Sequence, residues 1–410
     1  LTDIPLSCRY FPSAVVYDLG MDIRFFVLAT AAFLSGANLR VFDSLLPNIA
    51  TEFHTSIAIA SLVVAAFTFA YGLFQIFYGP FGDRYGRIKT VSAATTIVAI
   101  GSLGSALAQD LEWLAALRFL SGIGAAGIIP VSLAWIGDQT KYAERQVNLG
   151  YFISFILMGQ ILGPALGGAL AEFYSWRIIF YFFSITFFFM TVILIAVDHK
   201  FRSKYEAVKP SVTSDSPIQT YQKILKSSWC QTILIVVFFE GALFYGSFAF
   251  IGAWIKTELN LDYLTIGLLL SGFGFGGVIY TLSITRLQRV LGEKGFAMTG
   301  ACLLFLFFVG VQFMNSTPSI GVWCVLGGFG FYILHNTLQT KATEMYPKAR
   351  GTAISVFAMC LFGGQAVGTL AFGIMTSILG YSLSFMCAGV SLLMLGLFFV
   401  KKLNTQNRAH

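Results

Sequence analysis

Hydrophobic runs of about 20 residues alternate along the chain with short polar segments. A helix of this length matches the hydrocarbon core of a bilayer, so each run predicts one membrane-spanning helix. The pattern therefore predicts an all-α membrane protein with twelve transmembrane helices. They lie near residues 23–48, 57–81, 89–108, 113–137, 148–171, 176–197, 230–254, 264–285, 295–314, 319–340, 352–376 and 380–400.

The longest polar interruption follows the sixth run and divides the chain into two six-helix bundles. Its segment SPIQTYQKILKS has the pattern of a short amphipathic helix. The first 20 residues lack the hydrophobic stretch and cleavage site of a signal peptide, and Met21 is an alternative start. The predicted parts are a tail over 1–22, a bundle over 23–198, a linker over 199–228, a bundle over 229–402 and a tail over 403–410.

The positive charges predict the orientation of these helices. With the N-terminus in the cytoplasm, all but four of the 26 Lys and Arg residues fall in cytoplasmic segments. Arg177 and Lys256 fall outside, and Arg40 and Arg118 lie within spans. Because cytoplasmic loops are enriched in Lys and Arg, both termini are predicted to be cytoplasmic, in a multi-pass protein of the cell (inner) membrane.

Composition supports this class. Hydrophobic residues make up 57% of the chain and charged residues 11%, against about 25% charged in soluble domains. The net charge of +7 then reflects membrane topology and predicts no nucleic-acid partner.

The two halves carry an internal repeat. The segment ERQVNLGYFISFILMGQILG aligns with ARGTAISVFAMCLFGGQAVG at one constant offset. A duplicated bundle predicts two pseudo-symmetric halves that rock about a site at mid-membrane depth. The matched positions are Arg145 with Arg350, Gly159-Gln160 with Gly364-Gln365, and Gly163 with Gly368.

Three motifs carry a resemblance to a known family: GPFGDRYGRIK (79–89), RFLSGIGAAG (118–127) and GQILGPALGG (159–168). Together they resemble the major facilitator superfamily over nearly the whole chain. The third is similar to the helix-5 pattern of the bacterial twelve-helix drug–proton antiporters. The resemblance implies secondary transport by alternating access and favours export.

The first motif predicts a conformational latch. Gly79 permits close helix approach, and Arg87 can pair with Asp138. The resemblance places Asp83 against the start of helix 11, near Gly351. The alternative is that the basic residues only enforce topology. The predicted gating residues are Gly79, Asp83, Arg84, Gly86, Arg87 and Asp138.

Helix 5 carries Gly159, Gly163 and Gly167 four residues apart, and these line one face. Such a face lets helix backbones approach closely, with Pro164 bending the helix and Gly168 extending the motif. The face is predicted to be a packing seam, either purely structural or also a closed wall against leakage.

Four charged residues lie well inside predicted helices: Arg40, Asp43, Arg118 and Glu240. Charges at membrane depth are costly unless they are paired or functional. We predict proton coupling by Asp43, with Arg40 and Arg118 as alternating cationic partners, and with Glu240 as the next candidate. The alternative is a static Arg40–Asp43 ion pair. The pattern D-x-x-x-P from Asp43 also resembles helix 1 of multidrug–proton antiporters.

Polar residues within the spans form the predicted substrate site. His335 either titrates or hydrogen-bonds substrate with Asn336, or is a satisfied polar residue between helices. Gln160 and Gln365 either line the cavity or join helices. The predicted set is Asn38, Arg40, Asp43, Gln160, Tyr245, His335, Asn336 and Gln365.

The cysteines and histidines show no metal-binding spacing, and no phosphate loop or nucleophile elbow is found. We therefore expect no cofactor, no metal and no enzymatic activity. The prediction is proton-coupled export of a small amphipathic or hydrophobic compound by a monomer in the lipid bilayer. The alternative is a symporter or facilitator that takes up a small metabolite, including anionic or lipid-like ones.

Overall fold

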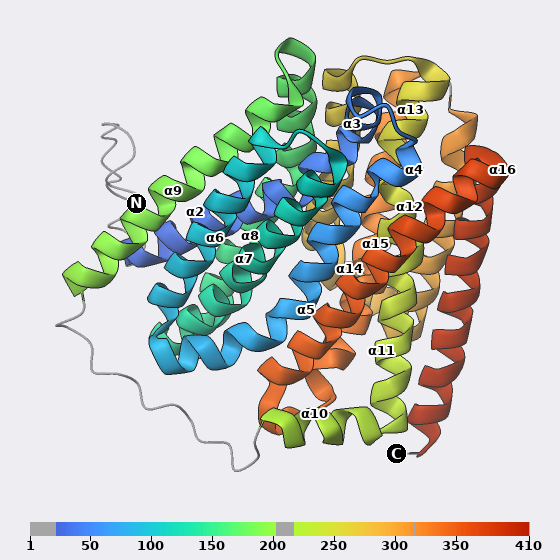
Figure 1. Ribbon diagram of the computed structural model, residues 1–410. Coiled ribbons are helices and arrows are strands. Elements are labelled where there is room, and N and C mark those ends of the chain that lie inside the picture. The colour runs from blue at the N-terminus through green and yellow to red at the C-terminus, as the bar shows by residue number, and fades with distance from the viewer. Residues whose placement is uncertain (1–21, 141, 202–216, 315, 410) are drawn as a thin grey trace, which may run out of the picture.

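The computed structural model describes residues 22–140, 142–201, 217–314 and 316–409, which form helices and turns without strands. The long helices run the length of a bundle, and shorter pieces lie between them (Figure 1). Ten helical segments of the described chain are long and apolar enough to cross a membrane. Two of them, Tyr263–Phe313 and Arg350–Gln406, have 51 and 57 residues. At about 1.5 Å per residue, each is more than twice the roughly 30 Å of a bilayer core.

Each of these two long segments turns at a single glycine. Gly292 has φ 62° and Gly380 has φ 73°, a left-handed conformation that glycine adopts without steric cost. Each break separates two crossings, so the helices are consistent with twelve spans. The predicted all-α membrane fold is confirmed. The short polar loops expected near these glycines are instead largely helical.

The helices of the first half end with α9. They are α2 (Ile23–Arg40), η1 (Val41–Ser44), α3 (Leu46–Glu52), α4 (Ile57–Ala60), α5 (Leu62–Tyr85), α6 (Arg87–Leu107), α7 (Leu111–Gln139), α8 (Tyr142–Phe173) and α9 (Trp176–Phe201).

The second half begins after a linker that contains α10 (Pro217–Lys226). It comprises α11 (Ser228–Glu240), η3 (Gly241–Tyr245), α12 (Gly246–Phe248), α13 (Ile251–Leu259), α14 (Tyr263–Gly310), η4 (Val311–Phe313), α15 (Thr317–Glu344), η5 (Pro347–Ala349) and α16 (Arg350–Ala409).

Each half has its own hydrophobic core. One buried cluster runs from Phe25 to Leu194, and another runs from Ile224 to Leu403. The predicted domain boundaries stay predictions. Residues 1–21, nearly all of the predicted tail, and residues 202–216, half of the predicted linker, lie outside the described residues. The helix expected in the linker is present as α10, which packs against α11 and α16. We call the end of the bundle where α10 lies the linker end, and the opposite end, with α3 and α13, the distal end (Figure 1).

The sequence repeat is also a repeat of helix contacts. A Cβ atom on Gly159 of α8 would overlap the carbonyl oxygen of Phe33 on α2. At the equivalent position, a Cβ on Gly364 of α16 would overlap the carbonyl oxygen of Phe238 on α11. Backbones this close leave room only for glycine, so both halves use the same seam.

The next turn of the seam repeats the pattern. Gly163 lies against the carbonyl oxygen of Ala37, and its equivalent Gly368 against that of Ala242. Gly167, further along α8, lies against the backbone of Val41.

The first helix of each half is interrupted at a similar level. In the first half α2 ends at Arg40 and passes through the 3-10 turn η1 before α3, where Pro47 occupies the first turn. In the second half α11 passes into η3, a π-turn, before α12. Interrupted helices at corresponding positions of two repeats mark binding sites in secondary transporters.

The seam predicts opposite effects at two adjacent glycines. Gly364→Ala should destabilise the protein by about 1–3 kcal/mol, because overpacking against the Phe238 carbonyl outweighs the gain in helix propensity. Gly363→Ala is the matched control, since no atom lies within 4 Å of its Cβ position. Thermal unfolding in detergent should show a lower Tm for Gly364→Ala and an unchanged or higher Tm for Gly363→Ala. Equal Tm values would show that the seam is loose.

Candidate functional site

Arg40 and Tyr245 mark the centre of the molecule. The guanidinium carbon of Arg40 lies 3.8 Å from the centroid of the Tyr245 ring. The repeat that aligns Gly159 with Gly364 also aligns Arg40 with Tyr245. Two equivalent residues can touch each other only near the axis that relates the halves, as in any two-fold interface. This contact therefore lies on the pseudo-two-fold axis.

Arg40 forms an ion pair on this axis with Asp43. Its Nη1 atom lies 3.6 Å from Asp43 Oδ2, and each side chain is 2% exposed. Neither Arg40 Nε nor Asp43 Oδ2 has a hydrogen-bond partner among the described residues. A buried pair whose hydrogen bonds are incomplete recovers little of its desolvation cost, so it is poorly suited to a purely structural role.

Arg118 has different surroundings from those predicted. It donates from Nη1 to Asn38 Oδ1 at 2.8 Å, and its guanidinium carbon lies 4.0 Å from the Phe67 ring centroid and 4.5 Å from that of Phe42. No carboxylate of the described chain lies within ion-pair distance of it. The predicted partnership with Asp43 is therefore absent in this conformation, because Asn38 and the rings hold the guanidinium within the first half.

Glu240 and His335 form a second pair, which lies in the second half and in which only Glu240 is fully buried. His335 Nδ1 lies 2.9 Å from Glu240 Oε2. The Glu240 side chain is 0% exposed and that of His335 is 14% exposed. The pair was not predicted, because the two residues lie on helices far apart in the sequence.

Two of the remaining predicted substrate residues form hydrogen bonds with protein groups. Gln160 accepts a hydrogen bond from the Tyr332 hydroxyl at 3.1 Å, which joins the two halves. Asn336 donates to the hydroxyl of Tyr280. Gln365 is buried, and its Oε1 has no partner among the described residues. None of these geometries tests substrate binding, so the predicted set stays a prediction.

The two halves meet closely at the distal end. A Cβ atom on Gly168 would overlap the carbonyl oxygen of Tyr263, and one on Gly267 would overlap that of Pro164. Glu172 of α8 accepts a hydrogen bond from the backbone N–H of Tyr263 at 2.8 Å. Tyr263 is the first residue of α14, so a carboxylate of one half caps a helix N-terminus of the other.

Asp43 takes part in this closure through its backbone. A Cβ atom on Gly252 of α13 would overlap the carbonyl oxygen of Asp43. The turn that carries the buried carboxylate is thus also packed against the interrupted helix of the other half.

The linker end is different, and two of the predicted gating contacts are not formed there in this conformation. No atom lies within 4 Å of the Cβ position of Gly79, Gly86 or Gly351, so Gly79 makes no close helix approach. Asp83 pairs with Arg87 at 2.6 Å within its own half instead of facing the start of helix 11.

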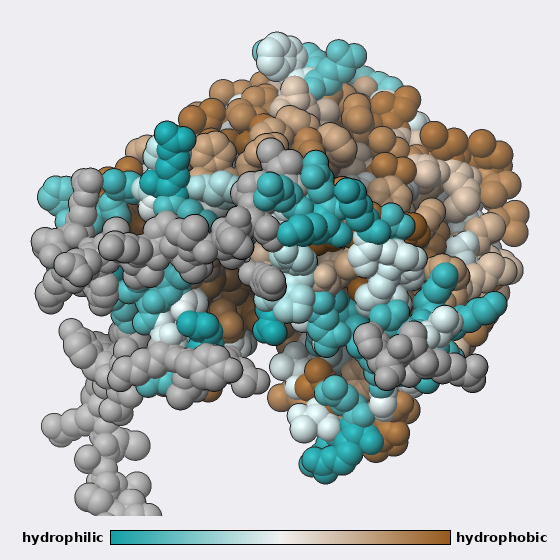
Figure 2. Space-filling model, turned by 90° about the horizontal axis from the view of Figure 1, so that it is seen from below, coloured by the Kyte–Doolittle hydropathy of each residue, from teal (hydrophilic) through white to brown (hydrophobic). Residues whose placement is uncertain are grey.

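The other gating contacts also stay within the first half. Arg87 pairs with Asp138 at 3.3 Å, as expected, and Arg84 lies over the ring of Tyr85. Gly72 of α5, nearer the centre, still lies against Phe362 of α16, with 2.9 Å between its Cβ position and Phe362 Cβ. Seen from this end, the surface is hollowed near its middle (Figure 2). The predicted contacts of Gly79 and Asp83 with the second half are absent here because the halves are apart at this end, so the gating role stays a prediction.

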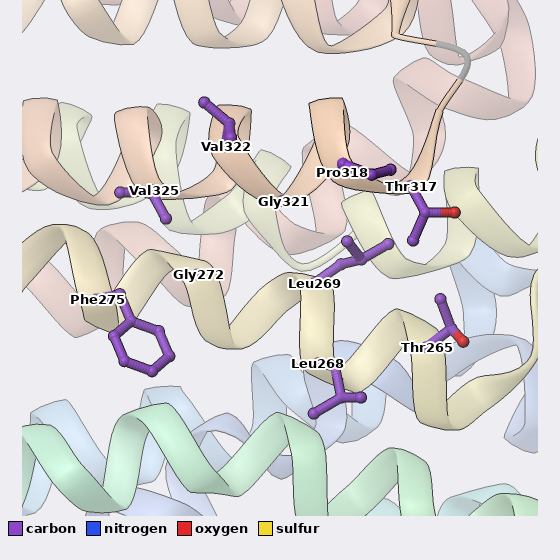
Figure 3. A pocket seen from close by; sticks show the side chains of 10 residues that line it. All are labelled: Thr265, Leu268, Leu269, Gly272, Phe275, Thr317, Pro318, Gly321, Val322 and Val325. Carbon is purple, nitrogen blue, oxygen red and sulfur yellow. The ribbon is translucent and has the colours of Figure 1, made fainter.

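A separate apolar groove lies between α14 and α15 (Figure 3). Its volume is about 540 Å³, and its walls include Leu268, Phe275 and Val322. Both helices belong to the second half, so the groove is distinct from the axis between the halves.

The comparisons with known proteins identify the family. The family model of the Major Facilitator Superfamily matches residues 28–347 and, in an overlapping match, 233–409. The chain belongs to this family. Among similar proteins, an uncharacterised MFS-type transporter, YceJ of Bacillus subtilis, is 23% identical over 84% of this chain and 87% of its own length. The multi-drug resistance efflux pump PmrA homolog of Lactococcus lactis is 25% identical over 73% of this chain and 74% of its own.

Solved structures of the superfamily fold are also similar. A bacterial homolog of the human lysosomal transporter Spinster, inward-facing and unoccupied, matches with a TM-score of 0.71 and 16% identity. The match covers 91% of this chain and 94% of that chain. The peptide transporter POT matches with a TM-score of 0.75 and 15% identity, over 95% of this chain and 96% of that one. These likenesses establish the fold.

Some residues that join the halves could not be identified from sequence motifs. Tyr332 and Glu172 join the halves, yet neither belongs to a recognised motif. The contact between Arg40 and Tyr245 could have been predicted, because extending the repeat alignment to helix 1 pairs these two residues.

The distal contact yields a prediction about conformational balance. Glu172→Ala should shift the population toward a distal-open state several-fold, since an acid at a helix N-terminus contributes on the order of 1 kcal/mol. Spin labels at the exposed residues Tyr174 and Thr257 would report the distance between the halves. Glu258→Ala is the control. It removes a carboxylate at the same end that forms no hydrogen bond or ion pair with the other half among the described residues, so the distance between the labels should not change. The same distance distribution in both variants would show that Glu172 does not hold the halves together.

Proposed function

We propose that the protein is a secondary active transporter that exports a small amphipathic or hydrophobic compound in exchange for protons. The observation that carries the proposal is the Arg40–Asp43 pair, buried on the axis while Arg40 stacks on Tyr245 of the other half. One titratable carboxylate is thereby linked to a contact between the two moving parts. The similarity to proteins named multi-drug resistance efflux pumps supports export.

The physical link between proton and movement is the charge of Arg40. When Asp43 takes up a proton, Arg40 loses its only ion-pair partner among the described residues and keeps the rings of Tyr245 and Phe273. Leaving one partner of a buried pair uncompensated destabilises a conformation by roughly 3–5 kcal/mol. Protonation of Asp43 therefore favours a conformation in which Arg40 is exposed to water. Deprotonation favours the conformation of this structure, in which Arg40 pairs with Asp43.

The orientation follows from the distribution of Lys and Arg, which assigns the linker end to the cytoplasm. The described conformation is then closed to the outside and open to the inside. In an antiport cycle this is the state in which Asp43 has released its proton to the cytoplasm and the compound enters.

Arg118 favours a second candidate, uptake of an anionic metabolite. It is a buried cation with no carboxylate partner in the described part of the chain, and an anionic group could occupy that role. Export ranks first because Arg118 is sealed beneath Phe67 and Phe42, whereas the Arg40–Asp43 pair lies between the halves.

The proposal predicts that Asp43→Asn uncouples transport from the pH gradient. Proteoliposomes would be tested with a panel of cationic, neutral and anionic fluorescent compounds under an imposed pH gradient. The wild type should move at least one compound against a proton flux, and Asp43→Asn should lose that proton flux by at least about tenfold, because the amide cannot exchange a proton.

Asp110→Asn is the matched control for this change. Asp110 caps the start of α7 at the distal end, and asparagine caps equally well, so transport should be unchanged. Proton-driven accumulation that survives Asp43→Asn would refute the role of Asp43. Movement of protons and compound in the same direction would indicate symport and therefore uptake instead of export.

A further inference from the structure

The linker helix α10 is attached to the second half by one of its faces. Thr220 and Ile224, one helical turn apart, are buried, and α10 packs against α11 and α16. Gln222 and Lys226 are exposed on the opposite face. The helix lies across the linker end of the bundle (Figure 1). An amphipathic helix seated in this way belongs to the body that covers its apolar face, which here is the second half.

One side chain of α10 reaches the first half. The ring of Tyr221 packs against the hydrophobic core of the second half, while its hydroxyl donates a hydrogen bond to the backbone carbonyl oxygen of Ile76 on α5 at 3.4 Å. Burial raises the pKa of Tyr221, so the hydroxyl keeps the proton that it donates. This bond therefore joins the halves at the end where their gating residues are apart.

The acceptor is a carbonyl group that α5 itself does not satisfy in the regular way. In an α-helix the carbonyl oxygen of Ile76 accepts from the N–H four residues later, and that residue is Pro80. Proline has no N–H, so the carbonyl lacks its helical donor. A partly buried carbonyl without a donor costs free energy, and a side chain that supplies the donor recovers that cost. Pro80 thereby creates a binding point for the hydroxyl of Tyr221.

The geometry of this bond depends on how the halves are arranged. Gly72 of α5 lies against Phe362 of α16, and Ile76 lies one helical turn further toward the linker end. When the halves rock about their contact near the centre, Ile76 moves relative to α10, which is held on α11 and α16. At 3.4 Å the bond is longer than most O–H···O bonds, so a small further separation breaks it. Closure of the linker end then leaves the Ile76 carbonyl without this donor.

We propose that α10 is a strap that stabilises the conformation with an open linker end, with Tyr221 supplying to Ile76 the hydrogen bond that Pro80 cannot supply. The strap lies outside the axial site and involves none of its charged residues. It sets the balance between the two conformations for any transported compound and any direction of transport. The inference is therefore independent of the proposed export function.

The test measures the distance between the halves in the full chain in detergent, without substrate and at a fixed pH. Spin labels at Tyr85 and Gly351, both exposed at the linker end, report its opening. Tyr221→Phe removes only the hydroxyl group and keeps the ring that packs on the second half. The ratio of closed to open molecules should rise about fivefold, which is the effect of losing one neutral hydrogen bond.

Pro80→Ala tests whether the missing N–H is the cause. Pro80 is exposed, and alanine restores a donor at this position, so Ile76 regains a partner within α5. In the Pro80→Ala background, Tyr221→Phe should change the closed-to-open ratio by less than about twofold, because both changes act on one acceptor. Gln222→Ala is the matched control on α10. It changes an exposed side chain that forms no hydrogen bond within the described residues, and it should match the wild type.

The proposal is overturned if Tyr221→Phe leaves the distances unchanged or shifts them toward a more open linker end. It is equally overturned if the shift has the same size in the Pro80→Ala background, because the bond to Ile76 would then not be its origin. Tyr221→Phe alone decides the question if the Pro80→Ala variant does not fold. Failure of the export function would be seen separately, as the absence of proton-linked movement in proteoliposomes, and would leave these distances unaffected.

Discussion

Arg40 is a permanent cation buried on the axis between two halves that must separate, and its charge has to be compensated wherever it lies. In the described conformation Asp43 supplies the counter-charge, and the rings of Tyr245 and Phe273 supply polarisable faces from the other half. Arg40 ends α2 and Asp43 lies three residues later in η1, so the two side chains share one face of the chain while α3 continues to the distal end. The glycine seams serve the same arrangement by holding α8 close to α2, and α16 close to α11 and η3.

The duplication has produced two halves with the same scaffold and different chemistry at equivalent positions. Gly36 and Gly241 are equivalent and both pack against a backbone carbonyl of the following seam helix. Arg40 in one half occupies the position equivalent to Tyr245 in the other, so a cation contacts an aromatic ring at the axis. Two arginines at these positions would repel each other. Asp43 and Glu240 are not equivalent positions, which allows one carboxylate to pair with arginine and the other with histidine.

Much of the fold could be predicted because it depends on local patterns: run length, glycine spacing and the distribution of basic residues. Gly159 and Gly163 were assigned to a seam from their spacing alone, and the structure places a helix backbone against both. The pairing of buried polar residues was harder to predict. Spacing identified the Arg40–Asp43 pair within one helix, but it could not pair Glu240 with His335 or direct Arg118 to Asn38. Contacts that depend on conformation were the least accessible, since Gly79 and Asp83 can meet the second half only when the linker end is closed.

The most direct test of the central claim measures the distance between the halves as a function of pH, without substrate. Spin labels at Tyr85 and Gly351, both exposed at the linker end, would follow its opening. In the wild type, acid should protonate Asp43, leave Arg40 uncompensated and shift the population toward a closed linker end. Asp43→Asn should show the acid distribution at every pH. A pH-dependent shift that persists in Asp43→Asn would contradict the claim that the Arg40–Asp43 pair couples protons to movement.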